Sequence, residues 1–68
     1  QGNLVVSSPR IMSTLRIFSV DGARVADYKI HGYSYAVNLQ HLPRGLYIIE
    51  VYGAEPEQLA RIRIVKDR

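Results

Sequence analysis

The feature of this chain that most restricts its fold is the alternation of apolar and polar residues at a spacing of two. The apolar positions of the three clearest runs are Tyr35, Val37 and Leu39, then Tyr47, Ile49 and Val51, then Ala60, Ile62 and Ile64. Side chains two residues apart lie on the same face of a β-strand, so each run turns one face towards a core. Since no stretch has the spacing of an amphipathic helix, the sequence predicts an all-β chain.

Turn-forming residues interrupt these runs at short intervals. Asp21-Gly22 lies between the apolar runs 15–20 and 23–30, a position typical of a tight hairpin because both residues tolerate positive φ. In the stretch from Leu42 to Gly45, Pro43 fixes φ at the second position, which predicts a type I turn. The other breaks are Ser7-Ser8-Pro9, His31-Gly32 and the loop from Gly53 to Gln58, which contains Pro56.

These signals together define the expected fold. They predict six strands, near residues 3–6, 13–20, 23–30, 34–40, 46–52 and 59–66. Half-polar alternation is typical of antiparallel sheets that have one face in water. The sequence therefore predicts an Ig-like antiparallel β-sandwich of about six to seven short strands. We expect residues 1–68 to form a single domain and to be part of a larger protein.

Composition excludes several classes of function. The chain has 68 residues and no cysteine, so disulfides and thiolate metal sites are ruled out. Its longest apolar run, from Leu46 to Ile49, is far shorter than the ~20 residues that span a bilayer. The net charge of +3 comes from scattered cations, which is typical of solvated strand faces. A small basic barrel that binds nucleic acid is an alternative supported by charge alone.

No group of residues has the pattern of a catalytic or cofactor site. His31 and His41 stand beside turns, and we expect both on the surface. Glu55 and Glu57 flank Pro56, but two loop acids fall short of the roughly six to eight oxygens that calcium takes. A chain of this length also has little room for an enzyme cleft. We therefore predict no enzymatic activity, no cofactor and no metal.

The tyrosines suggest a second alternative. Tyr35 and Tyr47 share a face with aliphatic residues and are expected in the core, whereas Tyr28, Tyr33 and Tyr52 are candidates for exposed aromatic rings. Exposed rings can stack on sugars or bases. An adhesive or carbohydrate-binding Ig-like module of an extracellular enzyme would fit that arrangement.

Three blocks of the sequence, taken in order, follow a known pattern: TLRIFSVDGARV, YAVNLQHLPRGLYIIEVYG and ARIRIVK. They resemble the C-terminal sorting domain of proteins exported by the bacterial type IX secretion system. That family has a strand ending in an aromatic residue and a glycine turn, then a Leu-x-x-Gly-x-Tyr-x-x-x-Val motif, then a basic last strand. The matching residues are Ile17, Phe18, Gly22, Arg24 and Val25; Leu42, Pro43, Gly45, Leu46, Tyr47 and Val51; and Ile62, Ile64, Val65 and Lys66.

The resemblance implies a role as a non-catalytic secretion signal. Such domains fold as Ig-like sandwiches in the periplasm of Gram-negative bacteria and are recognised by an outer-membrane translocon and a shuttle protein. A cell-surface sortase commonly removes them, and the cargo is secreted or linked to lipopolysaccharide on the cell surface. The resemblance also implies no nucleic-acid partner and no direct insertion into the membrane.

Two segments are the expected recognition surface, namely the turn at residues 43–45 and the last strand, which can lie at a sheet edge. The predicted recognition residues are Gly22, Leu42, Pro43, Gly45, Tyr47, Arg61, Arg63, Ile64, Val65 and Lys66. The alternative interpretation is that Pro43, Gly45 and Tyr47 serve only the turn, with recognition elsewhere. Exposed sheet edges also predict a homodimer or a strand-exchanged oligomer when the domain is isolated.

Two positions depart from the family pattern. The Pro-Asn-Pro segment that usually opens the family does not occur in these 68 residues. Ser19 stands where the family commonly has an aspartate after the aromatic residue. A side-chain cap at the first hairpin therefore cannot be carried over from the family.

Overall fold

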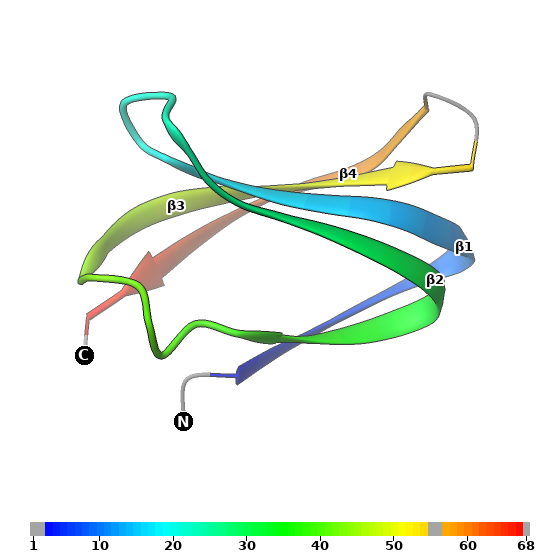
Figure 1. The fold of residues 1–68 in the computed structure, drawn as a ribbon, viewed down its shortest axis with the longest axis horizontal. Helices are drawn as coiled ribbons and strands as arrows, with labels where there is room; N and C mark the ends of the chain where they lie inside the picture. The colour runs from blue at the N-terminus through cyan, green and yellow to red at the C-terminus, as the bar shows by residue number, and fades with distance from the viewer. Residues whose placement is uncertain (1–2, 55–56, 68) are drawn as a thin grey trace.

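In the part of the chain that the structure describes, residues 3–54 and 57–67, the backbone forms one antiparallel sheet of four strands (Figure 1). The structure is a computed structural model. Its strands are β1 (Asn3–Ser19), β2 (Arg24–Asn38), β3 (Gly45–Gly53) and β4 (Gln58–Lys66), in the order β2-β1-β3-β4. None of the described residues belongs to a helix long and apolar enough to cross a membrane. The predicted all-β, antiparallel class is confirmed.

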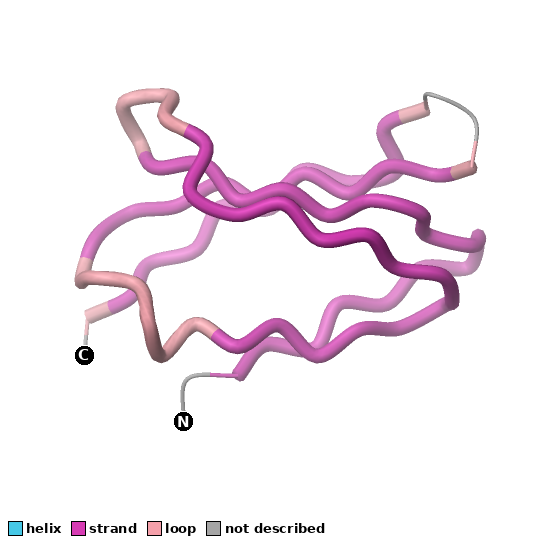
Figure 2. The backbone as a smooth tube through the Cα atoms, in the orientation of Figure 1, coloured by secondary structure: helices cyan, strands magenta, loops and turns pink. Residues whose placement is uncertain are grey.

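β1 and β2 are long strands that bend together. Residues 3–7 of β1 pair with residues 34–38 of β2, and residues 12–18 of β1 pair with residues 24–32 of β2. The register shifts between Ser7 and Met12, around Pro9, which has no amide hydrogen to donate to a partner strand. Figure 2 shows the result: beyond the bend, the paired residues 3–7 and 34–38 fold back over the rest of the sheet, so that one sheet forms two layers.

The predicted number of about six to seven strands is too high, because the described residues contain four strands. Segments 3–6 and 13–20 are both parts of β1, and segments 23–30 and 34–40 fall largely within β2. Ser7-Ser8-Pro9 and His31-Gly32 lie at the bend and do not end the strands. A bulge can change the direction of a strand while the strand keeps its partner.

Apolar residues from the alternating runs are buried between the two layers. The buried hydrophobic residues are Val6, Met12, Leu15, Ile17, Val37, Leu42, Tyr47, Ile49 and Val51. Leu15 lies opposite Val51, and Ile17 lies opposite Ile49, so neighbouring strands turn the same kind of residue inwards. The strands predicted at residues 46–52 and 59–66 lie within one residue of β3 and β4 at each end.

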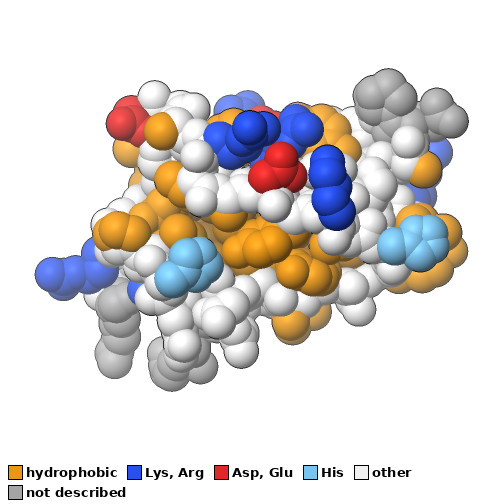
Figure 3. All heavy atoms as spheres, in the orientation of Figure 1, with side chains coloured by type: hydrophobic (Ala, Val, Ile, Leu, Met, Phe, Trp, Pro, Cys, Tyr) orange, Lys and Arg blue, Asp and Glu red, His pale blue; other side chains and the backbone are white. Residues whose placement is uncertain are grey.

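The core is incompletely covered at the outer strands. Ala26, Tyr28 and Ile30 of β2 are half-buried and pack against the core, as do Ile62 and Ile64 of β4. Figure 3 shows the β2 side of the molecule, where an apolar band lies below a group of charged side chains. The second layer, built from residues 3–7 and 34–38, is therefore too narrow to cover the wider layer completely.

The first turn differs from the predicted one in its backbone. The Gly22 amide donates to the Ser19 carbonyl at 3.0 Å, and the Ser19 amide donates to the Ala23 carbonyl at 2.8 Å. Gly22 has φ of 93°, whereas no described residue other than glycine has positive φ. The predicted hairpin at Asp21-Gly22 is present, and Asp21 does not adopt the positive φ that it tolerates. One left-handed glycine suffices because the register shifts by a bulge between Ile17 and Phe18.

The second turn lies three residues earlier than predicted. The Leu42 amide donates to the Leu39 carbonyl at 3.0 Å, so the turn spans residues 39–42. Proline disfavours helical φ and ψ in the residue before it, and neither the first nor the last residue of a turn has to be helical, so Pro43 is compatible with both placements. We call residues 42–45, which lead from this turn into β3, the 42–45 segment. It ends at Gly45, whose φ is 157°.

Candidate functional site

The 42–45 segment is fastened to β3 and β4 by side chains from both strands. Tyr47, which is 5% exposed, donates its hydroxyl hydrogen to the Pro43 carbonyl at 2.6 Å. Lys66 donates from Nζ to the Leu42 carbonyl at 2.8 Å. The register of β3 and β4 places Gly45 opposite Lys66. The structure thus brings these predicted recognition residues together at one end of the sheet.

β4 presents different residues on its two faces. Arg61, Arg63 and Val65 are exposed on the outer face, and Val65 is 72% exposed. Ile64 lies opposite Tyr47 and packs against the core. Of these predicted recognition residues on β4, Arg61, Arg63 and Val65 are accessible to a partner, whereas Ile64 has a structural role.

Charged side chains of alternating sign cross the outer face of the sheet in one row. From β2 to β4 the register aligns Asp27, Arg16, Glu50 and Arg61, and we call these four residues the charge row. Arg16 Nε lies 3.6 Å from Asp27 Oδ2, and Arg61 Nε lies 3.8 Å from Glu50 Oε2. Asp27 thus forms a cross-strand ion pair with Arg16, and the row ends with a positive charge on β4.

A shallow hollow of about 250 Å³ adjoins the charge row on the outer face. Phe18 and Ile48 lie opposite each other across β1 and β3 and line the hollow together with Gly22 from the first turn. Its other lining residues are Ser19, Val20, Glu50 and Arg61. The predicted recognition residues Gly22 and Arg61 therefore border the same depression.

Ile48 is one of the residues of this hollow that are not among the predicted recognition residues. The signal for it was present, because Leu46 and Ile48 are apolar residues on the face of β3 that alternation turns away from the core. Both side chains are half-buried, and Ile48 lines the hollow on the face that the alternation turns away from the core.

The first turn holds a carboxylate through local hydrogen bonds. The Ser19 hydroxyl donates to Asp21 Oδ1, and the Ala23 amide lies 3.5 Å from the same oxygen. The bond from Ser19, followed by the bond from the Ala23 backbone, lowers the pKa of Asp21 below its ordinary value, because both bonds favour the charged form. Ser19 thus contributes a side-chain hydrogen bond at the position where the family commonly has aspartate.

The candidate exposed tyrosines do not share a face. Tyr28 lies opposite the buried Leu15 and packs its ring 5.8 Å, centroid to centroid, from that of Tyr35. Tyr52 lies on the outer face, where the guanidinium carbon of Arg16 is 5.3 Å from its ring centre. Tyr33 is 57% exposed at the bend of β2. The structure therefore provides no common aromatic platform for a sugar.

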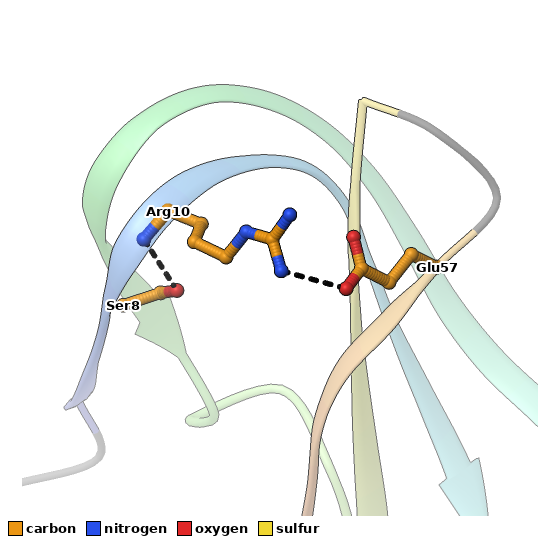
Figure 4. A network of polar contacts seen from close by, with 3 residues as sticks. All are labelled: Ser8, Arg10 and Glu57. Carbon is orange, nitrogen blue, oxygen red and sulfur yellow. Dashed lines mark hydrogen bonds and ion pairs between the residues drawn. The ribbon is translucent and has the colours of Figure 1, made fainter.

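The candidate polar groups outside this surface have surface or structural positions. His31 and His41 are exposed. Glu57 accepts a hydrogen bond from Arg10 Nη1 at 2.7 Å, and the Arg10 amide donates to Ser8 Oγ (Figure 4). Glu55, the other acid that flanks Pro56, lies outside the described residues, as does Pro56. Within residues 3–54 and 57–67, no three His, Asp or Glu side chains are grouped so that they could hold a metal ion.

One of three comparisons with known proteins found a match. The family described as "Secretion system C-terminal sorting domain" has a model that matches residues 1–66. Neither the curated proteins nor the solved structures contain a match to the chain. The family match includes all three blocks that resemble the sorting domains of type IX secretion. The chain therefore belongs to the secretion system C-terminal sorting domain family of the type IX system.

Proposed function

We propose that this domain directs a larger cargo protein across the outer membrane by the type IX secretion system. The observation that carries the proposal is the family match over residues 1–66. A signal that serves different cargo proteins must fold without them, and the described residues have their own sheet and their own core. On this proposal the domain catalyses no reaction, crosses the periplasm folded, and brings its cargo to the medium or the cell surface.

The partners in this proposal are an outer-membrane translocon and a shuttle protein, which bind the folded domain. A cell-surface sortase then separates the domain from its cargo. Because recognition of a folded domain depends on its surface, we assign this role to the outer face of β4 and the adjoining 42–45 segment. Arg61, Arg63 and Val65 support the assignment since all three are exposed, and Lys66 links them to the 42–45 segment.

An export assay tests this assignment. The 68-residue chain is fused behind a reporter protein in a bacterium with a type IX system, and the reporter is measured in periplasm and medium. In one variant Arg61, Arg63 and Val65 are all replaced by threonine, which preserves strand propensity. We expect this variant to leave folded reporter in the periplasm. Deleting residues 64–68 would be less informative, because Ile64 packs against the core.

The matched control replaces three exposed residues away from β4 by threonine. They are Val5, Lys29 and Tyr33, of which Val5 is 67% and Tyr33 57% exposed. We expect this control to be exported as well as the unchanged fusion. Circular dichroism of both purified variants must show the spectrum and melting temperature of the parent domain. Normal export of the folded β4 variant would contradict recognition through β4.

A further inference from the structure

We propose that β4 binds a partner strand in which acidic residues alternate with apolar ones, so that the partner becomes the next strand of the sheet. The inference deepens the proposed function and rests on it in one respect, namely that the partner strand belongs to the secretion machinery. The binding chemistry itself follows from β4 and the strands beside it.

β4 has one free side. Its residues pair with β3 from Gly45 opposite Lys66 to Tyr52 opposite Gln58, and no strand among the described residues pairs with the other side. Alternate residues of a strand direct their amide and carbonyl groups to the same side, so β4 offers a row of hydrogen-bonding groups to a new neighbour. Such an edge binds an extended peptide through the main chain, and the side chains determine which peptide binds.

The charge row indicates the first requirement for that neighbour. Its signs alternate from Asp27 on β2, through Arg16 and Glu50, to Arg61 on β4. Arg61 has Glu50 on one side, at 3.8 Å, and the free edge on the other. An acidic residue at the same level of an added strand would continue the alternation, and opposite charges directly across a sheet stabilise the pairing.

Arg63 and the inner face supply the second and third requirements. Arg63 lies opposite the apolar Ile48 and has no carboxylate partner in residues 3–54 and 57–67. A second acidic residue, two positions from the first, would pair with it. The intervening residues of the partner would face inwards beside the half-buried Ile62 and Ile64, where apolar side chains cover exposed core surface.

A second copy of β4 does not meet these requirements in the registers centred on residues 61 to 63. In an antiparallel pair of β4 strands centred on Ile62, Arg61 of each copy lies opposite Arg63 of the other. In the pairs centred on Arg61 or on Arg63, that arginine lies opposite its own counterpart. Like charges directly opposite each other destabilise a sheet. The same positions that repel a second β4 strand therefore attract an acidic one.

The other outer strand, β2, does not have this selectivity. Its outer face carries charges of both signs, Asp27 and Lys29. Asp27 Oδ2 already lies 3.6 Å from Arg16 Nε and 3.5 Å from Arg24 Nη1. An acidic strand beside β2 would meet Asp27 as a like charge, so we expect it to bind β4.

Direct binding to a synthetic peptide tests the proposal. The 68-residue chain is titrated into a labelled peptide of about nine residues in which valine and glutamate alternate, and anisotropy measures the binding. We expect slower amide exchange along β4 and not along β2. Replacing the glutamates by lysines should weaken binding roughly tenfold. Equal binding of a peptide with its valines and glutamates in separate blocks, or protection of β2 in place of β4, would overturn the proposal.

Two charge reversals locate the selectivity. Arg63→Glu and Lys29→Glu change the net charge equally, one on β4 and one on β2. We expect Arg63→Glu to lower the affinity for the glutamate peptide about three- to tenfold and to raise the affinity for the lysine peptide. Lys29→Glu should change neither affinity by more than about twofold. If Arg63→Glu lowers the melting temperature, Arg63→Gln replaces it, with a smaller loss expected. Equal losses in both positions would show that net charge alone governs binding, against the proposal.

Two further outcomes distinguish this inference from dimerisation through β4 and from the proposed function. A dimer that the peptide dissociates and that protects β4 from exchange would make a second copy the occupant and overturn the proposal. Normal export of a fusion carrying Arg63→Glu, together with lost peptide binding, would overturn the partner chemistry and leave the proposed function intact. If the unchanged fusion is not exported, the proposed function fails while the peptide result stands on its own.

Discussion

Replacing Gly45 by alanine would measure how far this residue serves the fold. Gly45 has φ of 157°, which a residue with a Cβ rarely adopts. A Cβ at this position would find its nearest neighbour, Tyr47 Cε2, at 3.8 Å, an ordinary van der Waals distance. Space is therefore available for a methyl group, and the destabilisation arises from the backbone conformation alone.

The expected loss is a large part of the stability of the domain. A residue held in a sparsely populated backbone region costs about 1–3 kcal/mol. A small domain without disulfides or metals has a free energy of unfolding of roughly 3–5 kcal/mol. At about 4–8 °C per kcal/mol for a domain of this size, we expect the melting temperature of Gly45→Ala to fall by roughly 5–20 °C.

Thermal and urea unfolding followed by circular dichroism measures this loss, with Gly32→Ala as the matched control. Gly32 is not among the glycines with positive φ, and a Cβ there would lie 4.0 Å from the nearest atom, the Ser34 carbonyl oxygen. We expect Gly32→Ala to change the free energy of unfolding by less than about 1 kcal/mol. Equal losses in the two variants would refute the reasoning, because the conformation at Gly45 would then carry no special penalty.

Two further predictions concern hydrogen bonds at the turns. Tyr47→Phe removes the bond to the Pro43 carbonyl and should lower the free energy of unfolding by about 0.5–1.5 kcal/mol; unchanged urea curves would contradict this. The lowered pKa of Asp21 gives a contribution to stability that is present above the ordinary pKa of aspartate and is lost as the pH falls through the lowered value. The difference in melting temperature between the parent and Asp21→Asn should therefore shrink below about pH 4, whereas a constant difference down to pH 2 would contradict the assignment.

Period-two alternation predicted the faces of the strands correctly because burial follows it directly. Ile49 and Val51 are buried and Glu50 lies between them on the outer face, as their spacing requires. The ends of β3 and β4 were predictable for the same reason, since polar or turn-forming residues stand where the alternation stops.

The number of strands was not predictable from these signals, because proline and glycine mark a bend as readily as an end. Pro9 and Gly32 both lie inside long strands, and only the pairing of the two strands with each other reveals that the ladder continues around the bend. The position of the second turn was missed for a related reason. Pro43 fixes its own φ but does not specify whether the turn precedes or follows it.

The candidate site was predicted in part. Sequence similarity selected Arg61, Arg63 and the 42–45 segment, and the register of β3 and β4 brings them to neighbouring positions. The charge row could not be predicted from the sequence, because its members come from four strands and only the fold establishes the register of those strands. Ile64 was predicted as a recognition residue but packs against the core. A position in a sequence motif does not reveal whether its side chain faces a partner or the core.

The unequal bonding of the strands determines how the sheet would yield to force. β1 is hydrogen-bonded to β2 on one side and to β3 on the other, whereas among the strands of residues 3–54 and 57–67 β4 is bonded to β3 alone. A force that peels the end of β4 away from β3 would therefore break the hydrogen bonds between these two strands one after another, before it acted on the hydrogen bonds of the central strand β1. If the secretion machinery binds β4 and pulls on it in this way, the domain would begin to unfold at β4 while the hairpin of β1 and β2 remained folded.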